Sequence, residues 1–146
     1  MISVSESLVI ERPLAEVFTT VADPFTQLKW DTNGLIEVKQ LTEGPLQKGA
    51  RYHGKAKGMG GTMEFDYEYI EYEPNRRFVH LSPLPFGEGR HIFEFEAAAN
   101  GTHLTQTIQV KPKGIFKLLA PVLKMGLRQR LQQINAGLRQ YLVAEE

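Results

Sequence analysis

Hydrophobic residues change their spacing at Gly114, and this change limits the possible folds more than any other feature of the chain. From Leu35 to residue 112, short segments alternate apolar and polar residues between Gly, Pro and Asn. This pattern is typical of an antiparallel meander. After Gly114 the apolar residues recur at steps of three and four, which predicts a long amphipathic helix. The expected class is therefore α+β, with a sheet followed by a helix.

The two halves of the predicted C-terminal helix differ in polarity. An apolar stripe runs along its whole length: Phe116, Leu119, Leu123, Leu127, Leu131, Ile134, Leu138 and Leu142. Beyond Leu127 the opposite face is polar, whereas Ile115, Leu118, Val122 and Met125 make the first half apolar nearly all round. Such a segment has to bury more than one face, and Pro121 is expected to kink or split it.

The apolar segment from Ile115 to Met125 has three interpretations, which the sequence leaves open. It closes one side of a ligand cavity, it forms a dimer contact, or it docks on a membrane. Four lysines surround it: Lys111, Lys113, Lys117 and Lys124.

The N-terminal region predicts a strand followed by two short helices. The run Leu8-Val9-Ile10 favours a strand within residues 2–11. Pro13 then ends the strand and suits the first turn of a helix. Asp23-Pro24 breaks that helix, and we expect Asp23 to be the N-cap of a second helix that contains Trp30.

A first hairpin is predicted around the turn Gly58-Met59-Gly60-Gly61, with Lys57 opposite Thr62. One face then carries complementary charges: Lys55 opposite Glu64, His53 opposite Asp66, and Arg51 opposite Glu68. The other face pairs small with large residues and ends on two tyrosines: Ala56 with Met63, Gly54 with Phe65, and Tyr52 with Tyr67. We expect the second face to point inward.

A second hairpin is predicted around a two-residue turn at Asn100-Gly101. This turn pairs Ala97 with Leu104, Phe95 with Gln106, and Phe93 with Ile108. His91 shares the inward face with Phe93. In the preceding strand, residues 77–81, both faces are similarly hydrophobic, so the sequence does not decide whether His80 or Leu81 points inward.

Composition excludes several classes of function. The 146 residues balance 17 Lys and Arg against 17 Asp and Glu and include no Cys, so no basic field attracts nucleic acid and no disulfide or thiolate site forms. The four histidines lack metal-ligand spacing, and we expect no metal or cofactor. No signal peptide or stretch of roughly 20 apolar residues is visible. We expect one cytoplasmic domain over residues 1–146, as a monomer or homodimer.

The order of elements resembles the helix-grip fold of START-like (SRPBCC) proteins, in particular the polyketide cyclase/dehydrase and lipid transport-like branch. The motifs that carry the resemblance are Asp23-Pro24 with Trp30-Asp31, residues 41–45 with 49–52, Pro74 with residues 76–78, and residues 101–104. The resemblance implies a curved antiparallel sheet of about seven strands wrapped around the C-terminal helix. It also implies a cavity between sheet and helix for an apolar molecule.

The inward residues of the sheet and the apolar part of the helix are the candidate ligand contacts. They are Trp30, Tyr52, Met63, Phe65, Tyr67, Phe93, Phe95, Gln106, Leu119, Val122 and Met125. Tyr52, Tyr67 and Gln106 need hydrogen-bond partners when buried, and a few polar groups in an apolar concavity are typical of a small-molecule pocket. Trp30 fits a packing role under the second helix as well as stacking on a ligand.

Three functions are compatible with these residues. The first is binding, or transport, of a small hydrophobic ligand such as a lipid or polyketide, without catalysis and with peripheral membrane contact as an open question. The second is a polyketide cyclase or dehydratase, for which Tyr67 and His91 are weak proton-transfer candidates. The third is a protein-interaction or co-chaperone-like module that uses the apolar half of the helix.

Overall fold

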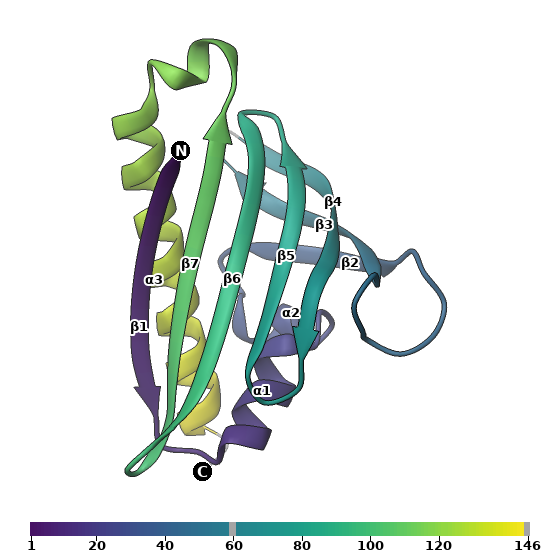
Figure 1. Cartoon of the computed structure of the whole chain (residues 1–146), viewed down its shortest axis with the longest axis vertical. Coiled ribbons are helices and arrows are strands. Elements are labelled where there is room, and N and C mark those ends of the chain that lie inside the picture. The colour runs from purple at the N-terminus through teal and green to yellow at the C-terminus, as the bar shows by residue number, and fades with distance from the viewer. Residues whose placement is uncertain (59–60, 145–146) are drawn as a thin grey trace.

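The seven strands form one antiparallel sheet in the order β1-β7-β6-β5-β4-β3-β2 (Figure 1). The computed structural model describes residues 1–58 and 61–144. The strands are β1 (Ile2–Ile10), β2 (Leu35–Gln40), β3 (Arg51–Gly58), β4 (Gly61–Glu73), β5 (Arg77–Leu84), β6 (Gly87–Ala98) and β7 (Gly101–Pro112). From β2 to β7 the sheet is a meander, and β1 joins it beside the last strand.

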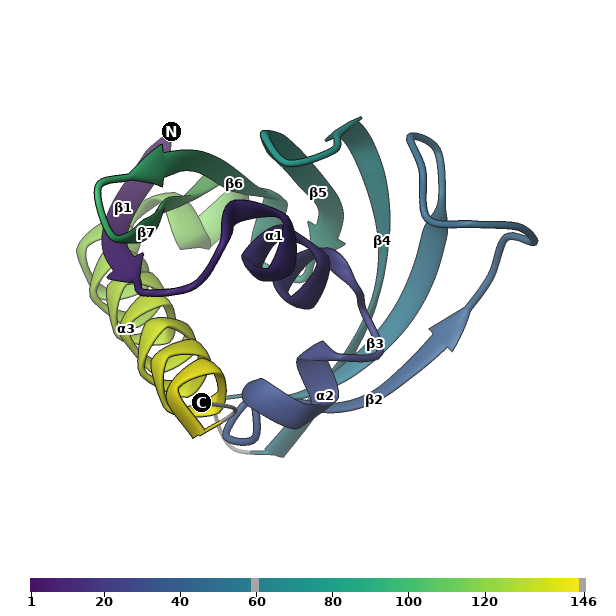
Figure 2. The ribbon, with the colours of Figure 1, turned by 90° about the horizontal axis from the view of Figure 1, so that it is seen from below.

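The helices lie on the concave side of the sheet and at its lower end. They are α1 (Leu14–Ala22), α2 (Gln27–Trp30), the 3₁₀ helix η1 (Gly114–Lys117) and α3 (Ala120–Ala144). Figure 2 shows the sheet curving from α3 around to β2, with α1 and α2 across the end that faces the viewer. The predicted α+β helix-grip architecture is therefore confirmed.

Pro121 divides the C-terminal helical region as predicted. The 3₁₀ helix ends at Lys117, and α3 begins at Ala120. Pro121 thus lies in the first turn of α3, where a missing backbone N–H breaks no helical hydrogen bond. Gly114 has φ of 57°, a left-handed conformation that suits glycine and turns the chain from β7 into η1.

Asp23 caps a turn and not the helix for which it was predicted. Its Oδ1 accepts a hydrogen bond of 2.9 Å from the backbone N–H of Phe25. The second helix begins only at Gln27, after Thr26, which makes no side-chain capping bond. The prediction was wrong because Asp23 closes the tight connection between α1 and α2.

The first hairpin has the predicted register in all seven pairs, from Arg51 opposite Glu68 to Lys57 opposite Thr62. Met59 and Gly60 of the predicted turn lie outside the described residues. On the outward face, the two ring nitrogens of His53 lie 2.6 Å from Asp66 Oδ1 and 3.0 Å from Glu64 Oε1. Hydrogen bonding to Asp66, and then to Glu64, raises the pKa of His53.

The second hairpin is shifted by two residues from the predicted register. Ala98 pairs with Gly101, so that the two turn residues are 99 and 100; Phe95 lies opposite Leu104 and Phe93 opposite Gln106. A Cβ atom on Gly101 would lie 2.0 Å from the carbonyl oxygen of Ile10, so glycine is needed for the approach of β1 and not for the turn. A shift of two keeps every side chain on its predicted face.

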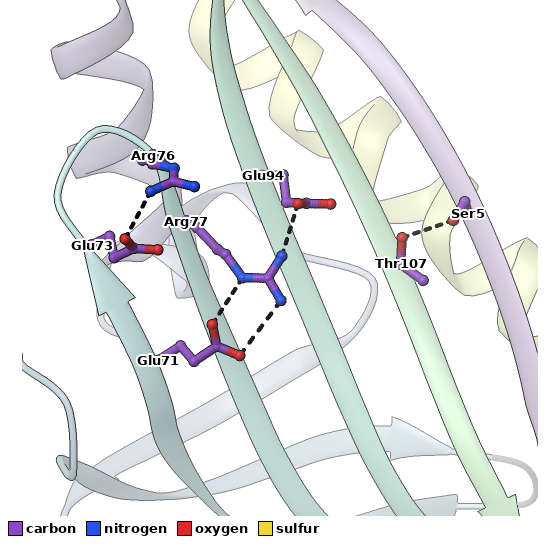
Figure 3. A network of polar contacts seen from close by, with 7 residues as sticks. All are labelled: Ser5, Glu71, Glu73, Arg76, Arg77, Glu94 and Thr107. Atoms are coloured by element: carbon purple, nitrogen blue, oxygen red, sulfur yellow. Dashed lines mark hydrogen bonds and ion pairs between the residues drawn. The ribbon is translucent and has the colours of Figure 1, made fainter.

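Ion pairs and hydrogen bonds connect neighbouring strands on the convex face (Figure 3). Arg77 Nε lies 3.0 Å from Glu71 Oε1, and Arg77 Nη1 lies 2.8 Å from Glu94 Oε2. The guanidinium thereby links β4, β5 and β6. Ser5 and Thr107 join β1 to β7 through a hydroxyl contact of 2.7 Å.

Two hydrophobic clusters fill the concave side. The lower core lies under α1 and α2 and includes Val17, Phe18, Trp30, Phe78 and Leu138. The upper core lies between the first half of α3 and the strands β1 and β7: Ile2, Val4, Ile108, Val110 and Leu131, with Phe86, Leu123 and Leu127 packed against it. Polar-tipped side chains define the candidate site: Tyr52 and Tyr67 belong to the lower core, and Gln106 lies on β7 between Leu104 of the lower core and Ile108 of the upper core.

Candidate ligand-binding site

A row of polar-tipped side chains crosses the concave face, one from each strand from β3 to β7. We call it the polar row, and its members are Tyr52, Tyr67, His80, His91 and Gln106. Ring centroids lie 5.8 Å apart for Tyr52 and Tyr67, 4.9 Å for Tyr67 and His80, and 6.2 Å for His80 and His91. In β5 the inward residues are thus Phe78, stacked on Phe93 at 4.3 Å, and His80.

Hydrogen bonds connect the polar row to α3. His91 Nε2 lies 2.9 Å from Gln106 Oε1, and Gln106 Nε2 donates to Asn135 Oδ1 at 2.5 Å. Because an amide oxygen only accepts, His91 carries its proton on Nε2 and leaves Nδ1 as an acceptor. Burial, reinforced by the nearby Arg130 charge, lowers the pKa of His91 to about 4. His91 is therefore neutral at pH 7.

The hydrogen bonds that connect His91, Gln106 and Asn135 do not extend to His80, in the middle of the polar row. His80 Nε2 is buried and has no hydrogen-bond partner among the described residues. Burial lowers the pKa of His80 well below its usual range, and burial raises the pKa of the adjacent Tyr67. A buried polar atom without a partner costs about 1 to 3 kcal/mol. A hydrogen-bonding group placed at His80 Nε2 would remove this cost.

The concave face is less completely covered around His80 than in the lower core. His80, His91, Met63 and Phe65 are half-buried although they point inward. By contrast, the inward aromatic residues of the lower core, Phe78, Phe93 and Phe95, are at most 5% exposed. The partly exposed side chains Met63, Phe65, His80 and His91 are thus the part of the concave face that is accessible to another molecule, whereas Tyr67 and Tyr69, beside His80, are buried.

Two openings lie at the ends of the polar row. A pocket of about 350 Å³ lies between the α1–α2 connection and the β2–β3 loop. It is lined by Thr19, Ala22, Asp23, Pro24, Phe25, Gln40, Gly44, Leu46, Tyr52 and Tyr72. A groove of about 610 Å³ between β1 and α3 includes Asn135. The polar row therefore begins at Tyr52, which lines the pocket. It ends at Gln106, which is hydrogen-bonded to Asn135 in the groove.

A buried ion pair holds α3 in position over the sheet. Asp31, at the end of α2, is 2% exposed, and both of its oxygens contact the guanidinium of Arg130. Gln27 Nε2 donates to Asp31 Oδ2 at 2.9 Å. A Cβ atom on Gly34 would overlap the same guanidinium. Sequence reasoning missed this pair because its members are 99 positions apart, and no local pattern connects them.

Comparison with known proteins assigns the chain to a family. Residues 1–143 match the profile of the family described as polyketide cyclase/dehydrase and lipid transport. The chain belongs to this family. The resemblance inferred from the sequence motifs is thereby confirmed. A search of curated protein sequences finds no significant match.

Several solved structures have the same fold as this member of the polyketide cyclase/dehydrase and lipid transport family, although their sequence identity to it is low. TTHA0849 from Thermus thermophilus is 16% identical, with 99% of each chain covered and a TM-score of 0.82. Ara h 8.0201 is 14% identical, with 97% of each chain covered and a TM-score of 0.73. SA2116 from Staphylococcus aureus, a protein of unknown function, is 10% identical over 99% of this chain and 94% of the other, with a TM-score of 0.78. Family and fold fit a small-ligand-binding module.

The structure brings seven of the candidate contacts to the concave face of this family member. These are Tyr52, Met63, Phe65, Tyr67, Phe93, Phe95 and Gln106. Trp30 is elsewhere: it is 2% exposed in the lower core, and its Nε1 donates to the carbonyl oxygen of Thr20 at 3.3 Å. Trp30 therefore packs α2 against α1.

The helix contacts predicted from the sequence do not reach the polar row. Leu119, Val122 and Met125 are 42%, 57% and 63% exposed. The stripe that includes Leu123 and Leu127 packs against the upper core instead, which leaves the other side of α3 facing solvent.

Asn135 joins the site without having been singled out in the sequence. It follows Leu131 by four positions and therefore lies on the inner side of α3; this spacing is the signal that would have identified it. His80 was undecided because its strand is hydrophobic on both faces. No group of three or more His, Asp and Glu side chains with metal-binding geometry is found among residues 1–58 and 61–144.

Proposed function

We propose that this protein binds a small, neutral, largely apolar molecule on the concave face of its sheet, with a polar group of the ligand at His80. The observation that carries the proposal is the buried Nε2 atom of His80, which lacks a partner within the described structure. Aromatic side chains flank the His80 ring: the Tyr67 and Tyr69 ring centroids lie 4.9 and 4.4 Å from the His80 ring centroid.

The protonation states support a neutral ligand. Burial lowers the pKa values of His80 and His91 and raises that of Tyr67, so all three side chains are uncharged at pH 7. A charged ligand group would lose hydration without gaining an opposite charge from them. A hydroxyl group both donates and accepts hydrogen bonds, so it pairs with either tautomer of His80. A hydroxylated polyketide, sterol-like or lipid-derived molecule fits this description.

The same pKa shifts favour binding over proton-transfer catalysis. A general acid or base works best when its pKa lies near the operating pH. In the ligand-free protein, the pKa of His91 is lowered to about 4 and the pKa of Tyr67 is raised. Both shifts move away from neutrality, so the proposed role is that of a binding or carrier protein, in agreement with the lipid transport in the family's description.

Nuclear magnetic resonance with a neutral probe tests the proposal. We expect 2-naphthol to shift the ring signals of His80 and His91, which lie on the concave face, and to leave His53 on the convex face unchanged. Mass spectrometry of molecules that copurify, after incubation with lipid extract, should identify neutral apolar compounds. Binding confined to the convex face, or no binding of any apolar compound, would contradict the proposed function.

A further inference from the structure

The start of the C-terminal helical region presents a largely exposed apolar surface. We call it the apolar cap, and its members are Ile115, Leu118, Leu119, Val122 and Met125. Ile115 and Leu118 are 71% and 85% exposed. On the other side of the same helix, Leu123 and Leu127 pack against the upper core. The segment is thus anchored by one face, and the other faces solvent.

The apolar cap lies at one end of the molecule. Figure 1 shows η1 and the first turns of α3 at the top, beside the turn between β5 and β6. Phe86 of that turn contacts Phe116 of η1, with ring centroids 6.3 Å apart. This contact fixes η1 against the sheet, so the cap is presented by a supported structure.

The part of the sequence that contains the apolar cap carries basic residues and no acidic ones. Between Glu96 and Glu145 the sequence has no Asp or Glu. The same stretch contains Lys111, Lys113, Lys117, Lys124, Arg128, Arg130 and Arg139. The four lysines are exposed and flank the cap; Glu88 lies opposite Lys111 in the sheet and offsets one of them. The protein as a whole has no net charge, so the positive charge is local.

From this combination we infer that the apolar cap docks on the surface of an anionic lipid membrane. Exposed apolar side chains enter the boundary between headgroups and acyl chains, while surrounding lysines attract anionic headgroups. A second copy of the chain fits less well, because it would bring the same lysines together. No helix within the described residues has the length and apolarity to cross a bilayer, so the contact is with the membrane surface. This inference is independent of the ligand proposed above.

Vesicle flotation tests the inference with two kinds of vesicle: phosphatidylcholine alone, and phosphatidylcholine with 30% phosphatidylserine. We expect wild-type protein to bind the anionic vesicles and to be released by 0.5 M NaCl, since salt screens the lysines. The L118E/V122E variant should bind about tenfold more weakly. The K117Q/K124Q variant should lose a similar factor in affinity for anionic vesicles, with no change for phosphatidylcholine vesicles.

The matched control is V9E/L41E, because Val9 and Leu41 are 51% and 49% exposed but lie outside the cap. It should bind vesicles like the wild type. Circular dichroism and thermal unfolding establish that each variant is folded. Wild-type protein that ignores anionic vesicles, or that binds them equally after L118E/V122E, overturns the inference. So does light scattering that shows a wild-type dimer made monomeric by L118E/V122E without vesicle binding.

Discussion

His91 of β6 and Gln106 of β7 are diagonal neighbours in the sheet, with Nε2 and Oε1 2.9 Å apart. The contact fixes the orientation of the Gln106 amide, which in turn holds Asn135 on α3. A hydrogen-bonded connection therefore reaches from the sheet to the helix between two apolar clusters. It ends at His91, next to His80, whose buried Nε2 has no hydrogen-bond partner in the part of the chain that the structure describes.

Stability should fall as the pH falls from about 6.5 to about 4. The unfolded chain protonates His91 near pH 6.5, whereas in the fold the pKa is lowered to about 4 by burial. Between these values the unfolded state binds more protons, so lowering the pH favours unfolding. At about 1.4 kcal/mol per pKa unit, the loss reaches on the order of 3 kcal/mol. His80 acts in the same direction. Urea unfolding at pH 7, 5.5 and 4 measures this loss.

The H91Q variant should lose less stability over this range, because glutamine does not protonate. H53Q provides the control with the opposite sign. The pKa of His53 is raised, so its stabilising contribution is present below about pH 6.5 and is lost at higher pH. Removing it should therefore lower stability at pH 5.5 relative to pH 7 and leave the slope between pH 5.5 and 4 essentially unchanged. Identical profiles for wild type and H91Q would show that His91 does not control the transition.

Two glycines of α3 should respond to alanine in opposite ways. A Cβ atom on Gly137 would lie 2.1 Å from the carbonyl oxygen of Trp30, whereas nothing lies within 4 Å of one on Gly126. We expect G137A to destabilise the protein by about 1 to 3 kcal/mol because α2 has to move away from α3. G126A should stabilise it by up to about 1 kcal/mol through helix propensity. Thermal unfolding distinguishes them, and equal effects would contradict this close packing.

Removing one member of the Asp31–Arg130 pair should be costly. R130M leaves the carboxylate of Asp31 buried with Gln27 as its remaining hydrogen-bond donor, and we expect a loss of about 3 kcal/mol. The control is R76M, whose ion pair with Glu73 is exposed on both sides and contributes under about 1 kcal/mol. Urea unfolding gives both values. A loss for R130M as small as that for R76M would show that the pair does not hold α3.

Replacing His80 by phenylalanine should increase stability. The substitution removes a buried polar atom that lacks a partner in the described structure and retains an aromatic ring beside Tyr67. We expect a gain of about 1 to 2 kcal/mol in the free energy of unfolding. A clear loss in chemical denaturation would indicate that His80 has a structural partner in the ligand-free protein.

Most of the polar row was predictable because strand parity depends on local pattern. Charge complementarity specified the first hairpin, so Tyr52 and Tyr67 were placed correctly. The second hairpin was misplaced by two residues because Gly101 serves a contact with Ile10 of β1, which no local pattern reveals. Its even shift nevertheless left His91 and Gln106 on the right face.

The remainder of the site depends on contacts between distant segments. Asp31 and Arg130 meet only because α3 crosses α2. The exposure of Val122 and Met125 likewise follows from which side of α3 packs on the sheet, and an all-round apolar sequence does not specify that side. The helix was predicted correctly, but the surface that it buries was not.

The affinity ratio of 2-naphthol to naphthalene, measured by calorimetry at pH 7 for wild type and H80F, tests the central claim most directly. The two probes differ only in one hydroxyl group, which is neutral at this pH. We predict that wild-type protein binds 2-naphthol about tenfold more tightly, that H80F binds both probes equally, and that H53Q keeps the wild-type ratio. The same ratio for wild type and H80F would show that His80 does not hold the polar group of the ligand.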